Sequence, residues 1–433
     1  MLTPLDPAAH HIYSNGRLTP FRSTIPLEAS EMTPPLHHKP FLLFLLARAA
    51  ATIAYQMTGV AVGWQIYSLT HRAFDLGLVG LVQFIPSAAL VLLVGHVADR
   101  YDRRRIVSLA QFVEAAALFG LCLGSHAQWA GREAILAFIF LIGIARAFEF
   151  TTLQTLVPSL VDQETLPRAM ALNASVRQAA VIIGPMMGGF LYIAGPAVVY
   201  AVSGALFLLS AAAIVAIRIE RPPSLLREPV SLHFVFAGIS YIRSRRVVLG
   251  AISLDLFAVL LGGATALLPI YARDILSAGP WGLGFLRSAP AVGAFAASIY
   301  LARQPLQRKV GKVMFAAVTW FGIATIVFAL STSIALSFVA LVVLGWSDML
   351  SVVIRSTLVQ LETPDEMRGR VSAVNAIFIG TSNELGEFES GLTAAWFGAM
   401  PAALIGGIGT LLVVLLWRRF FPELAQRERL QAD

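Results

Sequence analysis

Apolar residues gather into twelve runs along the chain, each near the ~20 residues that a helix needs to cross a lipid bilayer. Short polar or charged segments separate neighbouring runs. The pattern predicts an all-α membrane protein with twelve transmembrane helices. An even number of crossings places both termini on one side of the membrane. The runs cover approximately residues 41–69, 76–98, 106–124, 134–157, 167–194, 197–217, 248–273, 281–302, 310–330, 334–361, 368–394 and 397–418.

Composition agrees with this pattern. The 433 residues are 57% hydrophobic and only 13% charged, whereas soluble domains carry about 25% charged residues. The net charge of +7 does not indicate nucleic-acid binding, because most basic residues fall in alternate loops and near the termini. The opposite loops hold Arg72, Arg132 and Arg273. This asymmetry is typical of membrane proteins whose basic loops are cytoplasmic, so we expect both termini in the cytoplasm.

Three segments lie outside the apolar runs. Residues 1–40 are polar and predict a disordered cytoplasmic arm, and residues 419–433 predict a cytoplasmic tail. Residues 218–247 divide the chain into halves at 41–217 and 248–418. This segment begins as a linker, RIERPPSLLREP, and ends in SLHFVFAGISYIRSRR, which predicts an amphipathic helix on the membrane surface.

The two halves contain a repeated segment. Residues 155–173 align without a gap with residues 357–375, and shared positions include Thr155/Thr357 and Asn173/Asn375. The repeat joins runs four and five in one half, and runs ten and eleven in the other. Two six-helix halves around a long central loop are typical of a secondary transporter built from two bundles.

The loop GHVADRYDRRR (95–105) is the densest charge cluster between two runs. It resembles the loop between helices two and three of the major facilitator superfamily, and the matching residues are Gly95, Asp99, Arg100, Arg103 and Arg104. Asp102 replaces a second glycine of the family pattern, so we expect a different turn there.

The resemblance implies a conformational latch. Gly95 would let helix two approach helix eleven closely, and Asp99 would face the N-terminal end of helix eleven near residues 368–370. An anion at a helix N-terminus is favourable, and nearby arginines strengthen the contact. The latch would hold the outward-facing state. The alternative interpretation is an ordinary cytoplasmic loop rich in arginine.

The segment AVIIGPMMGG (180–189) resembles the fifth-helix signature of antiporters in the same superfamily. Gly184, Pro185, Gly188 and Gly189 match the signature, while Ala180 replaces its first glycine. Small residues four apart permit close helix approach, and proline bends a helix. The resemblance favours export. The alternative is a general packing stripe.

Three longer stretches, 56–70, 156–173 and 368–391, resemble the enterobactin-exporter-like branch of the superfamily, also called the transmembrane secretion effector group. The resemblance implies proton-driven export of a small molecule, often a siderophore or a drug, by a monomer in the inner membrane. It does not identify the cargo, because proteins of one fold carry different substrates.

The eleventh apolar run contains carboxylates, whose burial in a membrane costs free energy. Glu384 and Glu387 share a helical face with Gly380 and Gly391, and Asn383 precedes Glu387 by one turn. A carboxylate shielded from water holds its proton more readily and can exchange it near neutral pH. We interpret this face as a site for proton carriage or for a cationic group. A structural hydrogen-bond network between bundles is equally compatible.

Further charged residues lie inside other runs. Arg146 and Glu149 are three residues apart, as are Asp348 and Ser351, and Arg355 follows on the same face. The resemblance implies that helices one, four, seven and ten line a central cavity. The candidates for proton coupling are therefore Glu384, Glu387, Asp348 and Glu149, and those for substrate contact are Arg48, Gln56, Gln65, Arg146, Asp255, Arg355 and Asn383.

Purely structural roles are the alternative for these residues. Arg146 can neutralise Glu149, and Asp348 can neutralise Arg355. Other charges can lie near the cytoplasmic ends of the helices, where they reach water. Two weaker candidates are Glu114 and Arg287, and three aromatic residues are assigned to packing or to the membrane interface: Tyr55, Trp64 and Trp346.

The leading hypothesis is a proton-coupled exporter of a small molecule, with a siderophore preferred and multidrug efflux as the alternative. A polytopic enzyme is disfavoured because the eight histidines show no metal-ligand spacing within a run. An ATP-driven pump is disfavoured because the chain has no Walker phosphate loop. A transporter-fold sensor is a third rival. No cofactor or metal is expected.

Overall fold

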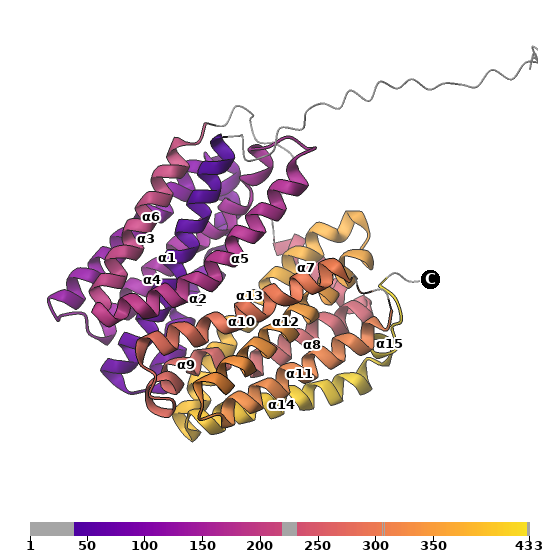
Figure 1. Cartoon of the computed structure of the whole chain (residues 1–433). Helices are drawn as coiled ribbons and strands as arrows, with labels where there is room; N and C mark the ends of the chain where they lie inside the picture. The colour runs from indigo at the N-terminus through magenta and orange to yellow at the C-terminus, as the bar shows by residue number, and fades with distance from the viewer. Residues whose placement is uncertain (1–38, 219–231, 305, 307, 431–433) are drawn as a thin grey trace, which may run out of the picture.

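The computed structural model describes residues 39–218, 232–304, 306 and 308–430. Regular structure in these residues is helical throughout, as hydrocarbon requires of a chain that must satisfy its own backbone polar groups. Two groups of helices lie side by side (Figure 1). The first contains α1 (Lys39–Thr70), α2 (Ala73–Arg100), α3 (Arg103–His126), α4 (Arg132–Gln154), α5 (Leu166–Leu191) and α6 (Pro196–Ala216).

The second bundle follows a short helix, α7 (Leu232–Ser244). Its members are α8 (Arg246–Leu261), continued through η4 (Ala264–Leu267), α9 (Leu268–Ile270) and η5 (Tyr271–Ile275), then α10 (Gly279–Arg303), α11 (Val310–Leu330), α12 (Ile334–Leu361), α13 (Asp365–Phe397) and α14 (Ala399–Phe420). Helices α2 and α5 of the first bundle pack against α13 and α10 of the second. These two pairs form the interface between the bundles.

Eleven helices within the described residues are long and apolar enough to cross a membrane. The twelfth, α13, has 33 residues but contains the carboxylates of Glu384, Glu387 and Glu389. It packs along α2 and α8. Glu387 lies against Gly80 of α2, and all three carboxylate residues are half-buried, so protein covers much of the polar surface of this helix of low hydropathy. The prediction of an all-α protein with two six-helix bundles is confirmed.

The seventh predicted run, 248–273, forms a broken helix instead of a continuous one. Helix α8 ends at Leu261, and the chain continues in short turns to Ile275. A Cβ added to Gly263 would lie 2.3 Å from the carbonyl oxygen of Gly386 on α13. The break therefore brings the backbone of the seventh run into direct contact with α13, at a spacing that a larger residue could not accept.

Helix α7 (Leu232–Ser244) forms where the sequence predicts an amphipathic helix. It packs against α13, and a Cβ on Gly238 would lie 2.7 Å from the carbonyl oxygen of Arg370. Its position on a membrane surface stays a prediction. Most of the predicted arm, 1–40, and the first part of the linker lie outside the described residues.

The described part of the tail is attached to the second bundle. A short helix, α15 (Pro422–Ala425), follows α14. Beyond it the Gly311 amide donates a 2.9 Å hydrogen bond to the Arg427 carbonyl oxygen, and the Arg427 side chain pairs with Glu362 at the end of α12. The tail therefore ties the ends of α11 and α12 together.

Candidate functional site

A cleft lies between the two bundles. Its walls come from α1, α2 and α4 on one side, and from η4, α9, α10 and α13 on the other, and it encloses about 680 Å³ of open space including its mouth. Apolar residues such as Val62 and Ile142 make up much of the wall. The polar lining residues are Tyr55, Gln56, Thr58, Gln83, Arg287 and Glu387.

Arg287 and Glu387 come from the second bundle and lie against glycines of the first. Arg287 Nη1 donates a 3.2 Å hydrogen bond to the carbonyl oxygen of Gly59, and a Cβ on Gly59 would lie 3.1 Å from Arg287 Nη2. A Cβ on Gly80 would lie 3.1 Å from Glu387 Oε2. The cleft thus contains one cation and one anion whose contacts cross between the bundles, so any relative movement of the bundles changes their surroundings.

The first bundle contributes an aromatic and amide wall. Gln83 Nε2 donates a 3.0 Å hydrogen bond to Tyr55 Oη, and the Arg146 guanidinium lies 4.1 Å from the centroid of the Tyr55 ring. Such a cation over an aromatic face is attractive. The assignment of Tyr55 to packing is wrong, because this residue lines the cleft and connects it to Arg146. Gln56 lies in the cleft as predicted.

A buried network stands behind that wall. Arg146 and Glu149 form an ion pair within α4, and Gln111 Nε2 donates a 3.2 Å hydrogen bond to Glu149. Both carboxylate oxygens of the buried Glu114, and Nε of the buried Arg48, have no hydrogen-bond partner among the described residues. Arg146 and Glu149 therefore neutralise each other, which is the structural alternative given for this pair. Glu114, a weaker candidate from the sequence, is buried beside this pair without a hydrogen-bond partner among the described residues.

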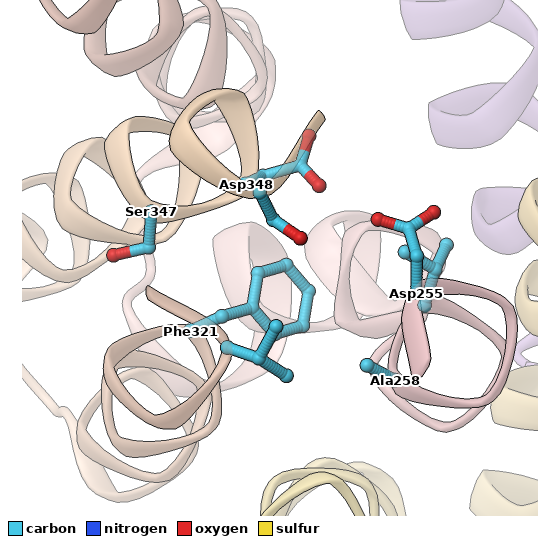
Figure 2. A pocket seen from close by; sticks show the side chains of 8 residues that line it. Asp255, Ala258, Phe321, Ser347 and Asp348 are labelled. Atoms are coloured by element: carbon cyan, nitrogen blue, oxygen red, sulfur yellow. The ribbon is translucent and has the colours of Figure 1, made fainter. Parts of the chain in front are cut away.

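The second bundle contains its own charged group. Arg355 pairs with Asp255 at 3.1 Å and donates a 3.1 Å hydrogen bond to Asn375 Oδ1. The alternative in which Asp348 neutralises Arg355 is not formed as an ion pair among the described residues: the buried Asp255 faces Arg355 from α8, whereas Asp348 lies two turns away on Arg355's own helix. Asp348 and Asp255 both line a smaller cavity (Figure 2).

Three other predicted residues have different surroundings. Gln65 accepts a 2.7 Å hydrogen bond from Tyr200 and donates one of 3.0 Å to Ser125, so it belongs to the interior of the first bundle and does not line the cleft. Asn383 is exposed and is not a cleft residue. Glu384 is half-buried one turn before Glu387, and its carbonyl oxygen lies 3.7 Å from the Cβ position of Gly80.

The arginine-rich loop is folded onto the first bundle. Asp102 caps α3 by accepting a 2.9 Å hydrogen bond from the Arg104 amide, and its carboxylate pairs with the Arg104 guanidinium at 2.8 Å. The side-chain hydrogen bond from Arg104 lowers the pKa of Asp102. Asp102 has φ of −60°, so the turn needs no glycine here, which explains the departure from the family pattern.

Arg103, Arg100 and Gly95 form no contact with α13 among the described residues. Arg103 donates a 3.3 Å hydrogen bond to the Thr155 carbonyl oxygen, and Arg100 is exposed. A Cβ on Gly95 would meet no atom within 4 Å. The predicted close approach at Gly95 is therefore absent from this conformation. The side chain of Asp99 lies outside the described part of the structure.

The glycines of the fifth-helix signature serve two neighbours. A Cβ on Gly184 would lie 2.7 Å from Gln56 Cβ, and one on Gly188 would lie 2.9 Å from Met57 Cα, both on α1. Gly189 faces α10, where its Cβ would lie 2.9 Å from Gly284 Cα. Pro185 lies within α5. The segment is a close-packing stripe inside the first bundle and at the bundle interface, and its implication of export stays a prediction.

The bundle interface is tightly packed at the end away from the described chain termini. A Cβ on Gly391 of α13 would lie 2.6 Å from Gly77 Cα on α2, and the Gly189 contact with Gly284 joins α5 to α10. Tyr67 Oη, at the end of α1, donates a hydrogen bond to Asp274 of η5. This closed end is formed by backbone contact as well as by side chains.

Two helical bundles around a shared polar cleft define a membrane transporter, and comparison with known proteins identifies the family. The model of the transmembrane secretion effector family matches residues 30–431, so the chain belongs to that family, within the major facilitator superfamily. It is 28% identical over 395 residues to the enterobactin exporter EntS of Citrobacter koseri, covering 89% of this chain and 93% of that protein. The corresponding protein of Shigella boydii serotype 18 is 28% identical over 387 residues, covering 88% and 91%.

Solved structures agree on the fold. A bacterial homologue of the human lysosomal transporter Spinster, in an inward-facing and unoccupied conformation, gives a TM-score of 0.71 at 13% identity and covers 91% of this chain and 98% of its own. A bacterial homologue of the iron transporter ferroportin, in an inward-facing state, gives 0.68 at 16% identity, with coverages of 90% and 99%. The family match and this fold together identify a multi-pass membrane transporter and not an enzyme.

Proposed function

We propose that the protein exports a siderophore from the cytoplasm by secondary active transport. The observation that carries this proposal is the match to the enterobactin exporters over nearly the full length of both chains, together with a polar cleft between the bundles. A siderophore bears several polar oxygen groups, and the cleft offers the Arg287 guanidinium, the Tyr55 ring and the Gln56 amide to such a molecule. A purely apolar cargo would leave these groups unpaired, at a cost in binding free energy.

The basic loops support an orientation with both termini in the cytoplasm, and the relatives support the inner membrane as the location. In that orientation the closed end faces outward, and the described conformation is inward-facing. An exporter must load its cargo from this state. Movement to the outward-facing state requires the bundles to separate at Gly77–Gly391 and Gly189–Gly284, and to approach at the other end.

Glu387 is the residue that we propose to couple this movement to protons. It lies in the cleft against Gly80 of the opposite bundle, so protonation changes the charge at the point where the bundles meet. Glu384, one turn earlier, extends the same face. Glu149 is already paired with Arg146, and we assign it a supporting role in positioning Arg146 over Tyr55.

The arginine-rich loop has its proposed role in the opposite state. When the cytoplasmic ends of the bundles approach, Asp99 would meet the beginning of α13 near residues 368–370. The absence of close contacts around Gly95 is compatible with a latch that is open in the inward-facing conformation.

The proposal is tested by deleting the gene and comparing culture supernatants with those of the parent strain by mass spectrometry after iron starvation. We expect a metal-chelating metabolite to disappear from the supernatant and accumulate in the cells. Complementation with the intact gene should restore secretion. If secreted chelators are unchanged while resistance to several unrelated toxic compounds falls, the protein is a multidrug exporter and the siderophore proposal is wrong.

A further inference from the structure

The second bundle contains a cavity that is separate from the cleft. It contains about 210 Å³ of open space, its mouth included, between α8, α11 and α12. Figure 2 shows the carboxylates of Asp255 and Asp348 extending toward one another from facing helices, with Phe321 on a third side. Val318 and Phe321 are the lining residues from α11, and both are apolar.

The charges around this cavity do not balance. Asp255 is buried and pairs with the buried Arg355 at 3.1 Å. Asp348 has no ion-pair partner within the described residues, and the charged groups that act on it are Asp255 and Arg355. Two carboxylates and one guanidinium leave one negative charge inside the bundle. Asp348 is half-buried, and a charge that is partly shielded from water and has no partner is costly. The group therefore lacks one balancing positive charge.

An unused hydroxyl group lines the same cavity. Ser351 follows Asp348 by three residues on α12 and is 2% exposed. Its Oγ interacts with the Asp255 carboxylate, but it forms no hydrogen bond of ordinary geometry with any described residue. Buried polar atoms normally have a partner. Carboxylate and hydroxyl oxygens are ligands suited to small, hard cations. The orphan oxygen and the missing positive charge thus occur at one place.

We propose that this cavity binds one monovalent cation, either Na⁺ or a proton, between Asp348, Asp255 and Ser351. Bound there, the cation neutralises the carboxylate that Arg355 leaves unpaired, and Ser351 Oγ completes its surroundings. The role of this site in coupling rests on the proposed transport function. The test of whether the site binds a cation does not depend on that function.

The broken helix connects this site to the cleft. Asp255 is on α8, which ends at the Gly262–Gly263 break, and the break contacts the backbone of Gly386. Gly386 immediately precedes Glu387. A cation that draws α8 toward α12 therefore acts on the part of α13 that holds the cleft carboxylate.

The test measures the thermal unfolding midpoint, Tm, of the purified full-length protein in detergent. One series compares NaCl with choline chloride at fixed pH and ionic strength, and the other lowers the pH from about 8 to about 6 in choline chloride. A ligand that binds the folded state raises Tm. A rise with Na⁺ but not choline identifies a Na⁺ site, and a rise with falling pH that is indifferent to Na⁺ identifies a proton site.

The Asp348→Asn variant should fold, because the amide keeps the shape of the side chain and removes the surplus charge. We expect it to lose the cation response, and Ser351→Ala to need a several-fold higher cation concentration for the same response. Glu389→Gln is the matched control, since Glu389 is also half-buried but accepts a hydrogen bond from Thr393 elsewhere on α13; it should keep the wild-type response.

The proposal is overturned if Asp348→Asn retains the wild-type response, or if the wild type responds to neither cation. These outcomes leave the export proposal untouched. Conversely, a gene deletion that leaves secreted chelators unchanged would refute siderophore export. A difference in the Tm response to cations between wild type and Asp348→Asn would still establish the cation site.

Discussion

The two ends of the bundle interface differ sharply. At one end, glycines bring α2 against α13 and α5 against α10, so that backbones touch at Gly77–Gly391 and Gly189–Gly284. At the other end, Gly95 has no neighbour within reach of an added Cβ, and Asp102 and Arg104 are bound within the first bundle. In the described part of the chain, backbone contact between the bundles is therefore seen at one end and not around Gly95 at the other.

This difference indicates how the molecule can hold two states. The closed end depends on small residues and few polar bonds, so its separation exposes little that must be paired. The other end carries arginines and carboxylates whose partners, on our proposal, change when the bundles approach. Packing stabilises one state, and charge is available to stabilise the other.

The largest effect is expected where the cleft meets the closed end. Glu387→Gln removes the exchangeable charge beside Gly80, and we expect proton-driven export to be abolished while the protein remains folded in the membrane. Transport in proteoliposomes under an imposed pH gradient measures this, with membrane abundance as the control. Full activity of the variant would remove Glu387 from the coupling mechanism.

Next in size is a steric wedge at the closed end. A Cβ on Gly284 would lie 2.3 Å from the Pro185 carbonyl oxygen, so Gly284→Ala should disfavour closure by about 2 kcal/mol, which is about 30-fold in the equilibrium between states. Gly380→Ala is the matched control, because its Cβ would meet no atom within 4 Å. Equal export rates for the two variants would show that backbone contact at this end is unimportant.

A smaller effect is expected from the latch. Asp99→Asn weakens a contact that we propose for the outward-facing state, and should slow turnover about 10-fold, equivalent to about 1.4 kcal/mol, with cargo affinity little changed. Export rates at several cargo concentrations separate the two quantities. Lost affinity with unchanged turnover would contradict the latch.

The smallest effect concerns the polar bond at the closed end. Tyr67→Phe removes the hydrogen bond to Asp274, whose carboxylate is partly exposed, so the loss should be about 1 kcal/mol, or about five-fold in the equilibrium between states. Accessibility of an introduced cysteine at the closed end to a membrane-impermeant thiol reagent reports this shift. Unchanged accessibility would assign closure to the glycines alone.

Hydrophobic pattern was sufficient to predict the twelve-helix architecture, because crossing a bilayer imposes helix length and hydropathy directly. The break after Leu261 was missed although Gly262 and Gly263 mark it in the sequence. The contact of Gly263 with Gly386, more than 100 residues later in the chain, could not be predicted. The sequence offered the local pairing of Arg146 with Glu149, one helical turn apart, but not that of Asp255 with Arg355, which meet only through packing of α8 on α12. Tyr55 was misassigned because an aromatic residue in an apolar run gives no sign of the arginine above its ring.

The most direct test of the account is a pair of distance measurements by electron spin resonance, in a Cys122→Ser background. One pair of spin labels replaces Arg72 and Trp396 near the closed end, and the other replaces Tyr101 and Glu366 near the open end; all four residues are exposed. The account predicts that Gly284→Ala lengthens the first distance and shortens the second. A longer first distance with an unchanged second distance would show that the two ends do not alternate, and would contradict the account.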